Sequence, residues 1–253
     1  MRMKLLVALT AAAAATMTLS TSAQASHSWG GYHWARTANP FTVKLGDNLT
    51  SNWKSYLGTA SSDWSKSTVL DTTVVAGQSS AKRCAATSGR VEVCNSTYGN
   101  NGWLGIASIS VTGGTHITSA TVKLNDTYFN TATYNTPSWR TMVTCQEVGH
   151  TFGLDHQDEV FDNPNLGTCM DYTNTPDGPP SNLHPNQHDY DELATIYSHL
   201  DSTSTVDQTA AVPQVTNDRS SWGTRVSHAA HGDTYVRDFG NGKSVVTFVI
   251  WAR

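Results

Sequence analysis

Short runs of apolar residues, separated by Gly, Asn and Ser turns, predict β-strands along much of the chain. The expected strands cover residues 32–34, 41–45, 69–75, 91–94, 104–111 and 120–124. One segment has the spacing of an amphipathic helix instead, with a stripe formed by Trp53, Tyr56, Leu57, Ala60 and Trp64. We expect this stripe to pack on the sheet as part of the core.

Capping residues predict two further helices. Thr136 is a good N-cap and Pro137 suits the first position of a helix, so a helix should begin there. Asn186 can cap a later helix. The apolar face of that later helix is formed by Leu193, Ile196, Tyr197 and Leu200.

The C-terminal part of the chain has a different composition. Residues 201–217 are rich in Ser, Thr, Val, Gln and Pro, which predicts a linker. Beyond it, residues 235–239 and 245–251 flank Gly240-Asn241-Gly242, a turn sequence typical of a β-hairpin. Residues 218–253 therefore form either a small β-hairpin extension of their own or extra strands on the main domain.

The segment from Gln146 to His156 places candidate metal ligands and a carboxylate at helical spacing. Gln146 and His150 are four residues apart, so they project from one face of a helix, and Glu147 lies beside them. Gly153 allows a left-handed turn after the helix, which could return His156 toward the same point. This spacing favours a metal site over scattered surface residues.

These residues resemble the long zinc signature of the metzincin metallopeptidases, HExxHxxGxxH, with Gln146 in place of the first histidine. Residues 168–172, Thr-Cys-Met-Asp-Tyr, resemble the methionine turn of that family. The Met-x-Tyr form is similar to the astacin and serralysin branches, while the overall layout, over about residues 30–200, is more similar to a matrixin. The order of strands, one helix, more strands and then the motif helix also resembles a metzincin.

The resemblance implies an α+β, metzincin-like domain over residues 26–200, with a twisted mixed β-sheet, an active-site helix and a closing C-terminal helix. It implies Zn²⁺ as cofactor, with His150 and His156 as ligands and with Met170 and Gly153 in structural roles. Zinc prefers nitrogen and sulfur donors, so Gln146 is expected to be a weaker ligand through its side-chain oxygen.

The implied activity is that of a zinc metalloendopeptidase, which hydrolyses peptide bonds with a metal-activated water. Glu147 would be the general base, and Tyr172 would be either a further ligand or a donor to the oxyanion. The alternative is a catalytically degenerate zincin-like domain that binds extracellular partners. Retention of Glu147 favours the enzyme, because a general base has no evident task in a binding module.

The N-terminus predicts export. A basic start, an apolar run from Leu5 to about Leu19 and a small-x-small site ending at Ala25 are typical of a secretory signal peptide, residues 1–25. Cleavage would remove Arg2 and Lys4 and change the formal charge from -4 to -6. This acidic balance does not favour nucleic acid as a partner. We expect a secreted monomer that acts on proteins or peptides and is not inserted in a membrane.

The four cysteines are an even number in an exported chain, so disulfides are expected. Of the three possible pairings we favour Cys84 with Cys94 and Cys145 with Cys169. Cys145 precedes Gln146 by one residue and so points about 100° round the helix from it, which disfavours Cys145 as a metal ligand.

Three other histidines, His116, His184 and His188, are expected to be surface residues rather than ligands. A serine hydrolase is not indicated, because the chain has no Gly-x-Ser-x-Gly sequence.

Overall fold

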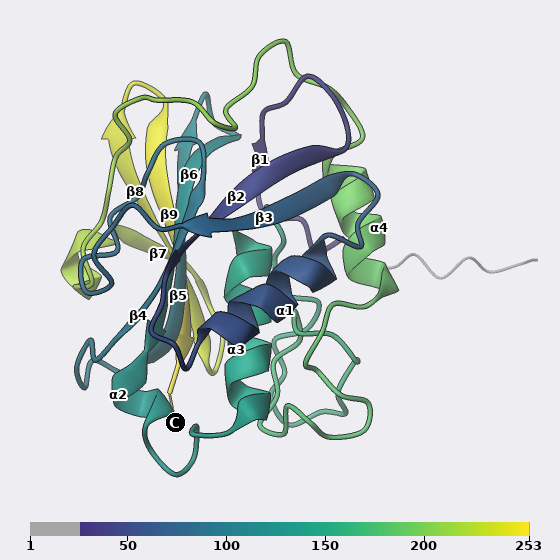
Figure 1. The fold of residues 1–253 in the computed structure, drawn as a ribbon, viewed down its shortest axis with the longest axis vertical. Helices are drawn as coiled ribbons and strands as arrows, with labels where there is room; N and C mark the ends of the chain where they lie inside the picture. The colour runs from purple at the N-terminus through teal and green to yellow at the C-terminus, as the bar shows by residue number, and fades with distance from the viewer. Residues whose placement is uncertain (1–25, 253) are drawn as a thin grey trace, which may run out of the picture.

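The computed structural model describes residues 26–252, so the predicted signal peptide lies outside the described residues. The fold is α+β, with a mixed nine-stranded sheet and few helices. In Figure 1 most of the strands lie to the left of helices α1, α3 and α4. Buried side chains of α1, α3, α4 and the sheet form one main hydrophobic core.

The strands are β1 (His33–Trp34), β2 (Phe41–Asn48), β3 (Leu70–Ala76), β4 (Val91–Ser96), β5 (Trp103–Thr112), β6 (His116–Asn125), β7 (Thr224–His228), β8 (Gly232–Gly240) and β9 (Lys243–Trp251). The helices are α1 (Lys54–Trp64), α2 (Asp126–Phe129), α3 (Pro137–His150) and α4 (Gln187–Ile196), with a 3₁₀ turn at Arg219–Ser221.

The sheet has a parallel half and an antiparallel half. Its strand order is β3-β2-β4-β6-β5-β9-β8-β7, and β1 pairs with β6 off this path. The pairs β2–β3, β2–β4 and β4–β6 are parallel, whereas β5 is antiparallel to both of its neighbours. Parallel strands are normally buried on both faces, and every residue of β4 except the last is buried.

The helices predicted from periodicity and capping are confirmed, except that α4 ends at Ile196, so that Leu200, expected on its apolar face, lies beyond the helix and is exposed. Trp53, Leu57, Ala60 and Trp64 of the expected stripe are buried in the core. The Trp64 indole Nε1 also donates to the Cys145 carbonyl at 3.1 Å, which joins α1 to α3.

Both expected N-caps are also present. The Thr136 side chain accepts a hydrogen bond from the Trp139 amide at the start of α3, and Pro137 is the first residue of the helix. Asn186 and Asp189 form a capping box at the start of α4.

Two elements have no counterpart among the sequence predictions. Helix α2 has only 4 residues, too few to show a helical period, and it begins where the Asn125 side chain accepts from the Thr127 amide. Strand β7 is exposed along its whole length because it is a terminal strand of the sheet. It therefore lacks the alternation of buried and exposed residues that identifies a half-buried strand.

The C-terminal strands are extra strands of the main sheet. Strand β9 pairs with β5 from Trp103 to Thr112, and β8 and β7 continue the sheet outward. The segment that leads to them lies against β5 and β6, where Ser110 Oγ donates to the Pro213 carbonyl at 2.9 Å and Lys123 Nζ donates to Asn217 Oδ1 at 2.7 Å. Residues 201–217, predicted as a linker, thus lie along the main sheet and connect α4 to further strands of that same sheet.

Both favoured disulfides are present. Cys84 pairs with Cys94 and Cys145 pairs with Cys169. The second bond joins α3 to the methionine turn, and such a loop stabilises a fold by roughly 3 kcal/mol in the chain-entropy model. Disulfides are typical of an oxidising, extracellular-type environment. Within residues 26–252, none of the helices has the length and apolar character that a membrane span requires.

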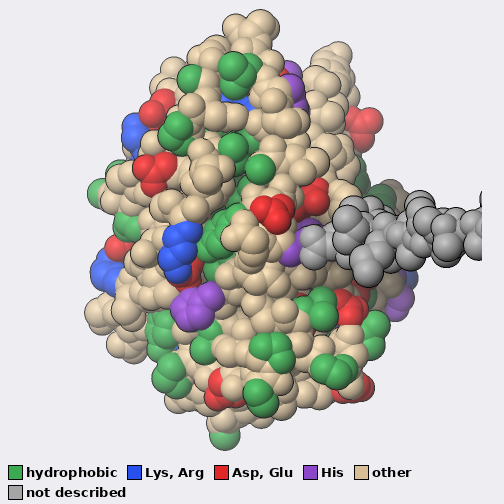
Figure 2. All heavy atoms as spheres, turned by 90° about the vertical axis from the view of Figure 1, so that its right-hand side faces the viewer, with side chains coloured by type: hydrophobic (Ala, Val, Ile, Leu, Met, Phe, Trp, Pro, Cys, Tyr) green, Lys and Arg blue, Asp and Glu red, His purple; other side chains and the backbone are tan. Residues whose placement is uncertain are grey.

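The surface carries few charges, since Asp, Glu, Lys and Arg make up 14% of the chain. Figure 2 shows one face on which uncharged polar groups and backbone predominate and charged side chains are scattered. The Lys and Arg side chains on this face are few and do not form a large cluster.

The buried Lys123 predicts a pH dependence of stability. Burial lowers the pKa of Lys123 to about 8, while an unfolded lysine has a pKa of about 10.4. Between these values the unfolded chain binds more protons, so stability rises with pH, and the penalty is fully present below about pH 8. Lys123→Met should therefore be more stable than wild type at pH 7, by up to about 3 kcal/mol.

This advantage should disappear above about pH 10.5, where lysine is neutral in both states. Urea unfolding of the two proteins at pH 7 and pH 10.5 measures the difference, and the other titrating groups are common to both. An equal difference at the two pH values would contradict the prediction.

Candidate metal centre

The candidate ligands lie on the last turns of α3 and in the loop after it. Gln146, Glu147 and His150 are at most 1% exposed, so this helix buries polar side chains among apolar neighbours. The chain leaves α3 through Gly153, whose φ is +93°. A Cβ at Gly153 would lie 1.9 Å from the Tyr32 carbonyl oxygen, so only glycine fits the turn that returns His156 to the helix.

The two histidines face each other through their Nε2 atoms. These atoms are 3.1 Å apart. His150 Nδ1 lies 2.8 Å from the Leu154 carbonyl oxygen, which can only accept, so Nδ1 carries the proton and Nε2 offers its lone pair. Two zinc-bound imidazole nitrogens in a tetrahedral site are about 3.3 Å apart, given the usual zinc–nitrogen distance. The spacing is that of a hydrogen bond from His156 to the His150 lone pair, and it is also close to that of two metal ligands.

The pKa values of His150 and His156 shift in opposite directions. Burial lowers the pKa of His150, and the neighbouring His156 lowers it further, so His150 is neutral and able to bind a metal. Burial also acts to lower the pKa of His156, but Asp155 and Glu159 outweigh it and raise that pKa. His156 Nδ1 lies 3.4 Å from Asp155 Oδ1 and 3.5 Å from Glu159 Oε1. These carboxylates lie on the Nδ1 side of the ring, where metal-binding histidines have their outer partners, but at ion-pair distance and without a hydrogen bond to Nδ1.

Gln146 presents an oxygen that has no hydrogen-bond partner. Its Nε2 donates to the Cys169 carbonyl at 2.9 Å, which assigns the orientation of the amide. Its Oε1 is buried and accepts no hydrogen bond from any residue that the structure describes. A buried acceptor left without a partner costs about 1–3 kcal/mol, so a ligand at this oxygen would remove a penalty.

Glu147 is buried against β5. A Cβ at Gly105 would lie 2.5 Å from Glu147 Oε1 and 2.9 Å from Val143 Cγ1, so the absence of a side chain at Gly105 makes room for the carboxyl. Burial raises the pKa of Glu147 well above its usual value, although the charge of His156 and a hydrogen bond with the Ala107 backbone act against the shift. Glu147 Oε2 has no hydrogen-bond partner within residues 26–252.

The methionine turn packs directly beneath α3. A Cβ at Gly149 would lie 2.7 Å from the Met170 sulfur, so the helix and the turn touch at backbone distance. The Tyr172 ring centroid is 4.2 Å from that of His156. Tyr172 is buried, which raises its pKa, as does the nearby charge of Glu159. Met170 and Tyr172 thus lie beside the histidines, where the sequence analysis expected them.

The C-terminal strands cover this centre. The Phe248 ring of β9 stacks on His150 with a centroid distance of 4.2 Å and an interplanar angle of 4°. A Cβ at Gly232 of β8 would lie 1.6 Å from the Tyr172 hydroxyl oxygen, so the glycine makes room for that side chain. Sequence reasoning missed both residues, because periodicity identifies Phe248 as apolar but does not reveal what it packs against.

The His150 and His156 rings contact each other, Tyr172 packs on His156, Met170 lies against Gly149, and Gln146 and Glu147 lie on the last turns of the same helix as His150. Two clusters of His, Asp and Glu side chains that could hold a metal ion occur in the described part of the chain. One consists of Asp155, His156 and Glu159 and belongs to this centre, and the other consists of His33, His116 and Asp201. Models of known protein families give no match to the chain, and no curated protein matches it.

The contact between Gly105 and Glu147 generates a stability prediction. Gly105→Ala should lower the free energy of unfolding by about 1–3 kcal/mol, because the new methyl group overlaps the Glu147 carboxyl and Val143. Gly58→Ala is the matched control, since Gly58 lies in α1 with no atom within 4 Å of its added Cβ. That variant should gain roughly 0.5–1 kcal/mol from helix propensity. Urea unfolding measures both, and a neutral Gly105→Ala would contradict the packing argument.

Proposed function

We propose that the chain is a secreted zinc metalloendopeptidase with a matrixin-like metzincin domain. The observation that carries this proposal is the pair of Nε2 atoms of His150 and His156, 3.1 Å apart, with one lone pair fixed by the Leu154 carbonyl. The order of strands, α1, further strands and α3, followed by the methionine turn, supports the metzincin assignment. The two disulfides and the predicted signal peptide support secretion.

The donor set fits a zinc ion. His150 and His156 would hold it through Nε2, and Gln146 would hold it through the buried Oε1 that otherwise has no partner among the described residues. The Gln146 oxygen is a weaker donor than an imidazole nitrogen, so zinc affinity should be below that of a three-histidine site. Tyr172, beside His156, is the group that could compensate as a further ligand.

When bound, zinc supplies a water of lowered pKa and polarises the carbonyl of the peptide to be cleaved. Glu147 Oε2 would accept the proton of that water and then donate it to the leaving amine. Burial raises the pKa of Glu147, which makes its carboxylate a stronger proton acceptor than an exposed glutamate. The Tyr172 hydroxyl would donate a hydrogen bond to the oxyanion. Protein or peptide chains are the proposed substrates.

A second candidate function is a non-catalytic, zincin-like domain that binds extracellular partners. The burial of the centre favours it, because Phe248 stacks on His150 and leaves Glu147 only 1% exposed. Under this alternative the histidines would hold a metal for stability alone, and the protein would contain zinc without cleaving peptides.

Substitution of Glu147 tests the peptidase. Glu147→Gln should lower cleavage of casein or of a quenched peptide by about 10²–10⁴-fold, because a general base is removed. Its zinc content and unfolding midpoint should equal those of wild type. The chelator 1,10-phenanthroline should abolish wild-type cleavage, and added zinc should restore it. Equal activity of the variant and wild type would refute the mechanism, and zinc-loaded wild type without cleavage would favour the second candidate.

Substitution of Gln146 tests its role as a ligand. Gln146→His should bind zinc more tightly than wild type, since imidazole nitrogen replaces amide oxygen, and Gln146→Ala should bind it more weakly. We expect the zinc affinity to rise or fall by about 10–100-fold, which is the usual effect of substituting a residue that supports a metal site. Titration against a competing zinc chelator gives the three affinities. Identical values would place Gln146 outside the coordination shell.

A further inference from the structure

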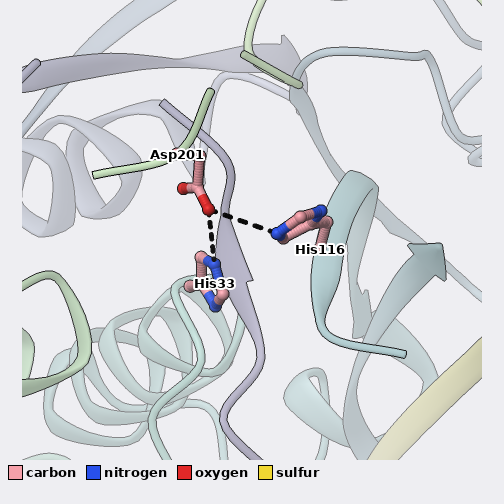
Figure 3. Close-up of side chains that lie close together, drawn as sticks. All are labelled: His33, His116 and Asp201. Carbon is pink, nitrogen blue, oxygen red and sulfur yellow. Dashed lines mark ion pairs between the residues drawn. The ribbon is translucent and has the colours of Figure 1, made fainter. Parts of the chain in front are cut away.

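The side chains of three histidines, His33, His116 and His199, lie within 4 Å of one carboxylate, that of Asp201. His33 begins β1 and His116 begins β6, and these two residues are register partners. His199 and Asp201 follow α4. Figure 3 shows His33 and His116 pointing at the same oxygen of Asp201. Three segments that are far apart in the sequence therefore meet at this cluster.

The ligand atoms of His33, His116 and Asp201 lie within 4.8 Å of one another, and three of the four distances that follow are close to those between zinc ligands. Asp201 Oδ1 lies 3.3 Å from His116 Nε2, 3.5 Å from His33 Nε2 and 3.8 Å from His199 Nε2. The Nε2 atoms of His33 and His199 are 3.2 Å apart. Neighbouring ligand atoms of a tetrahedral zinc site are about 3.3–3.4 Å apart, given zinc–nitrogen and zinc–oxygen distances near 2.0–2.1 Å.

Hydrogen bonds outside the cluster hold two of the ligand atoms in place. His33 Nδ1 lies 2.8 Å from the Gly31 carbonyl oxygen, so it carries the ring proton of a neutral imidazole. The Nε2 lone pair of His33 then faces both an oxygen of Asp201 and the Nε2 atom of His199, and a cation placed among these atoms would be held by all of them. The other carboxylate oxygen, Asp201 Oδ2, already accepts from Arg36 Nη1 at 3.0 Å.

Protonation of the imidazoles would stabilise this cluster less than a metal ion would. Asp201 has one negative charge, and Arg36 already neutralises it through Oδ2. Protonation of all three imidazoles would therefore place three further positive charges around a balanced pair, within 4 Å of one oxygen. A single divalent ion satisfies all three imidazoles in their neutral form and costs less repulsion. Imidazole and carboxylate ligands in tetrahedral arrangement suit zinc.

We propose that His33, His116, His199 and Asp201 bind a zinc ion in a site separate from the candidate metal centre. The two sites share no residue. This ion would join β1, the start of β6 and the chain after α4, and it has a structural role because four protein ligands leave no open position.

Zinc content of the full chain tests the proposal. The variant His116→Gln/His199→Gln removes two ligands that are partly exposed, with side chains 35% and 50% accessible, so the core is left intact. After zinc loading and dialysis, it should contain about one zinc per chain fewer than wild type. His228→Gln, at an exposed histidine of β7, is the control and should not change the zinc content.

A second variant distinguishes zinc bound at this cluster from zinc bound at the candidate metal centre. The variant His150→Ala/His156→Ala lacks the candidate metal centre, and it should still retain about one zinc per chain. Cobalt in place of zinc should give the intense visible absorption of tetrahedral coordination in that background. The absorption should disappear when His116→Gln/His199→Gln is added.

The proposal is overturned if His116→Gln/His199→Gln contains as much zinc as wild type, with far-UV circular dichroism showing that both are folded. It is equally overturned if a folded His150→Ala/His156→Ala protein binds no zinc. Neither result bears on the peptidase, because the candidate metal centre contains none of the four residues.

Discussion

Burial of polar side chains on α3 is the constraint on which the rest of the structure depends. A buried donor or acceptor must find a partner, because its loss of water costs free energy. Two polar atoms at the centre are satisfied by backbone groups, since Gln146 Nε2 donates to the Cys169 carbonyl and His150 Nδ1 donates to the Leu154 carbonyl. Gln146 Oε1 and Glu147 Oε2 are left without partners among the described residues, and two imidazole nitrogens face each other beside them. That pattern is understandable if a cation and its water belong there.

Three parts of the fold contact α3 and so fix the position of its polar side chains. The Cys145–Cys169 bond and the close packing of Met170 on Gly149 join the methionine turn to α3. Trp64 of α1 donates to the Cys145 carbonyl from the second side. Strand β5 supplies the space at Gly105 on the third. Rigid elements rather than loops thus position Gln146, Glu147 and His150, which is what a preorganised site requires.

Local patterns in the sequence predicted what depends on neighbours along the chain. The stripe on α1, the caps of α3 and α4 and the spacing from Gln146 to His156 are all short-range signals, and each element lies where its signal placed it. Contacts between segments that are far apart in the chain have no short-range pattern in the sequence from which they could be predicted. The stacking of Phe248 on His150 joins β9 to α3, and the cluster around Asp201 joins β1, β6 and the chain after α4. Nothing in the spacing of His33, His116 and His199 shows that the sheet brings them together.

The pairing of β9 with β5 decides how an extended chain can approach the centre. Strand β5 lies against Glu147 at Gly105, and its backbone groups pair with β6 on one side and with β9 on the other. Extended peptides bind many proteins by adding a strand to a free sheet edge. In the described chain the strand order of this sheet ends at β3 and β7, and neither of these strands is a neighbour of β5. Strand β9 therefore occupies the edge of β5 that a peptide would otherwise pair with. A peptide could pair with β5 on that side only if β9 moved away.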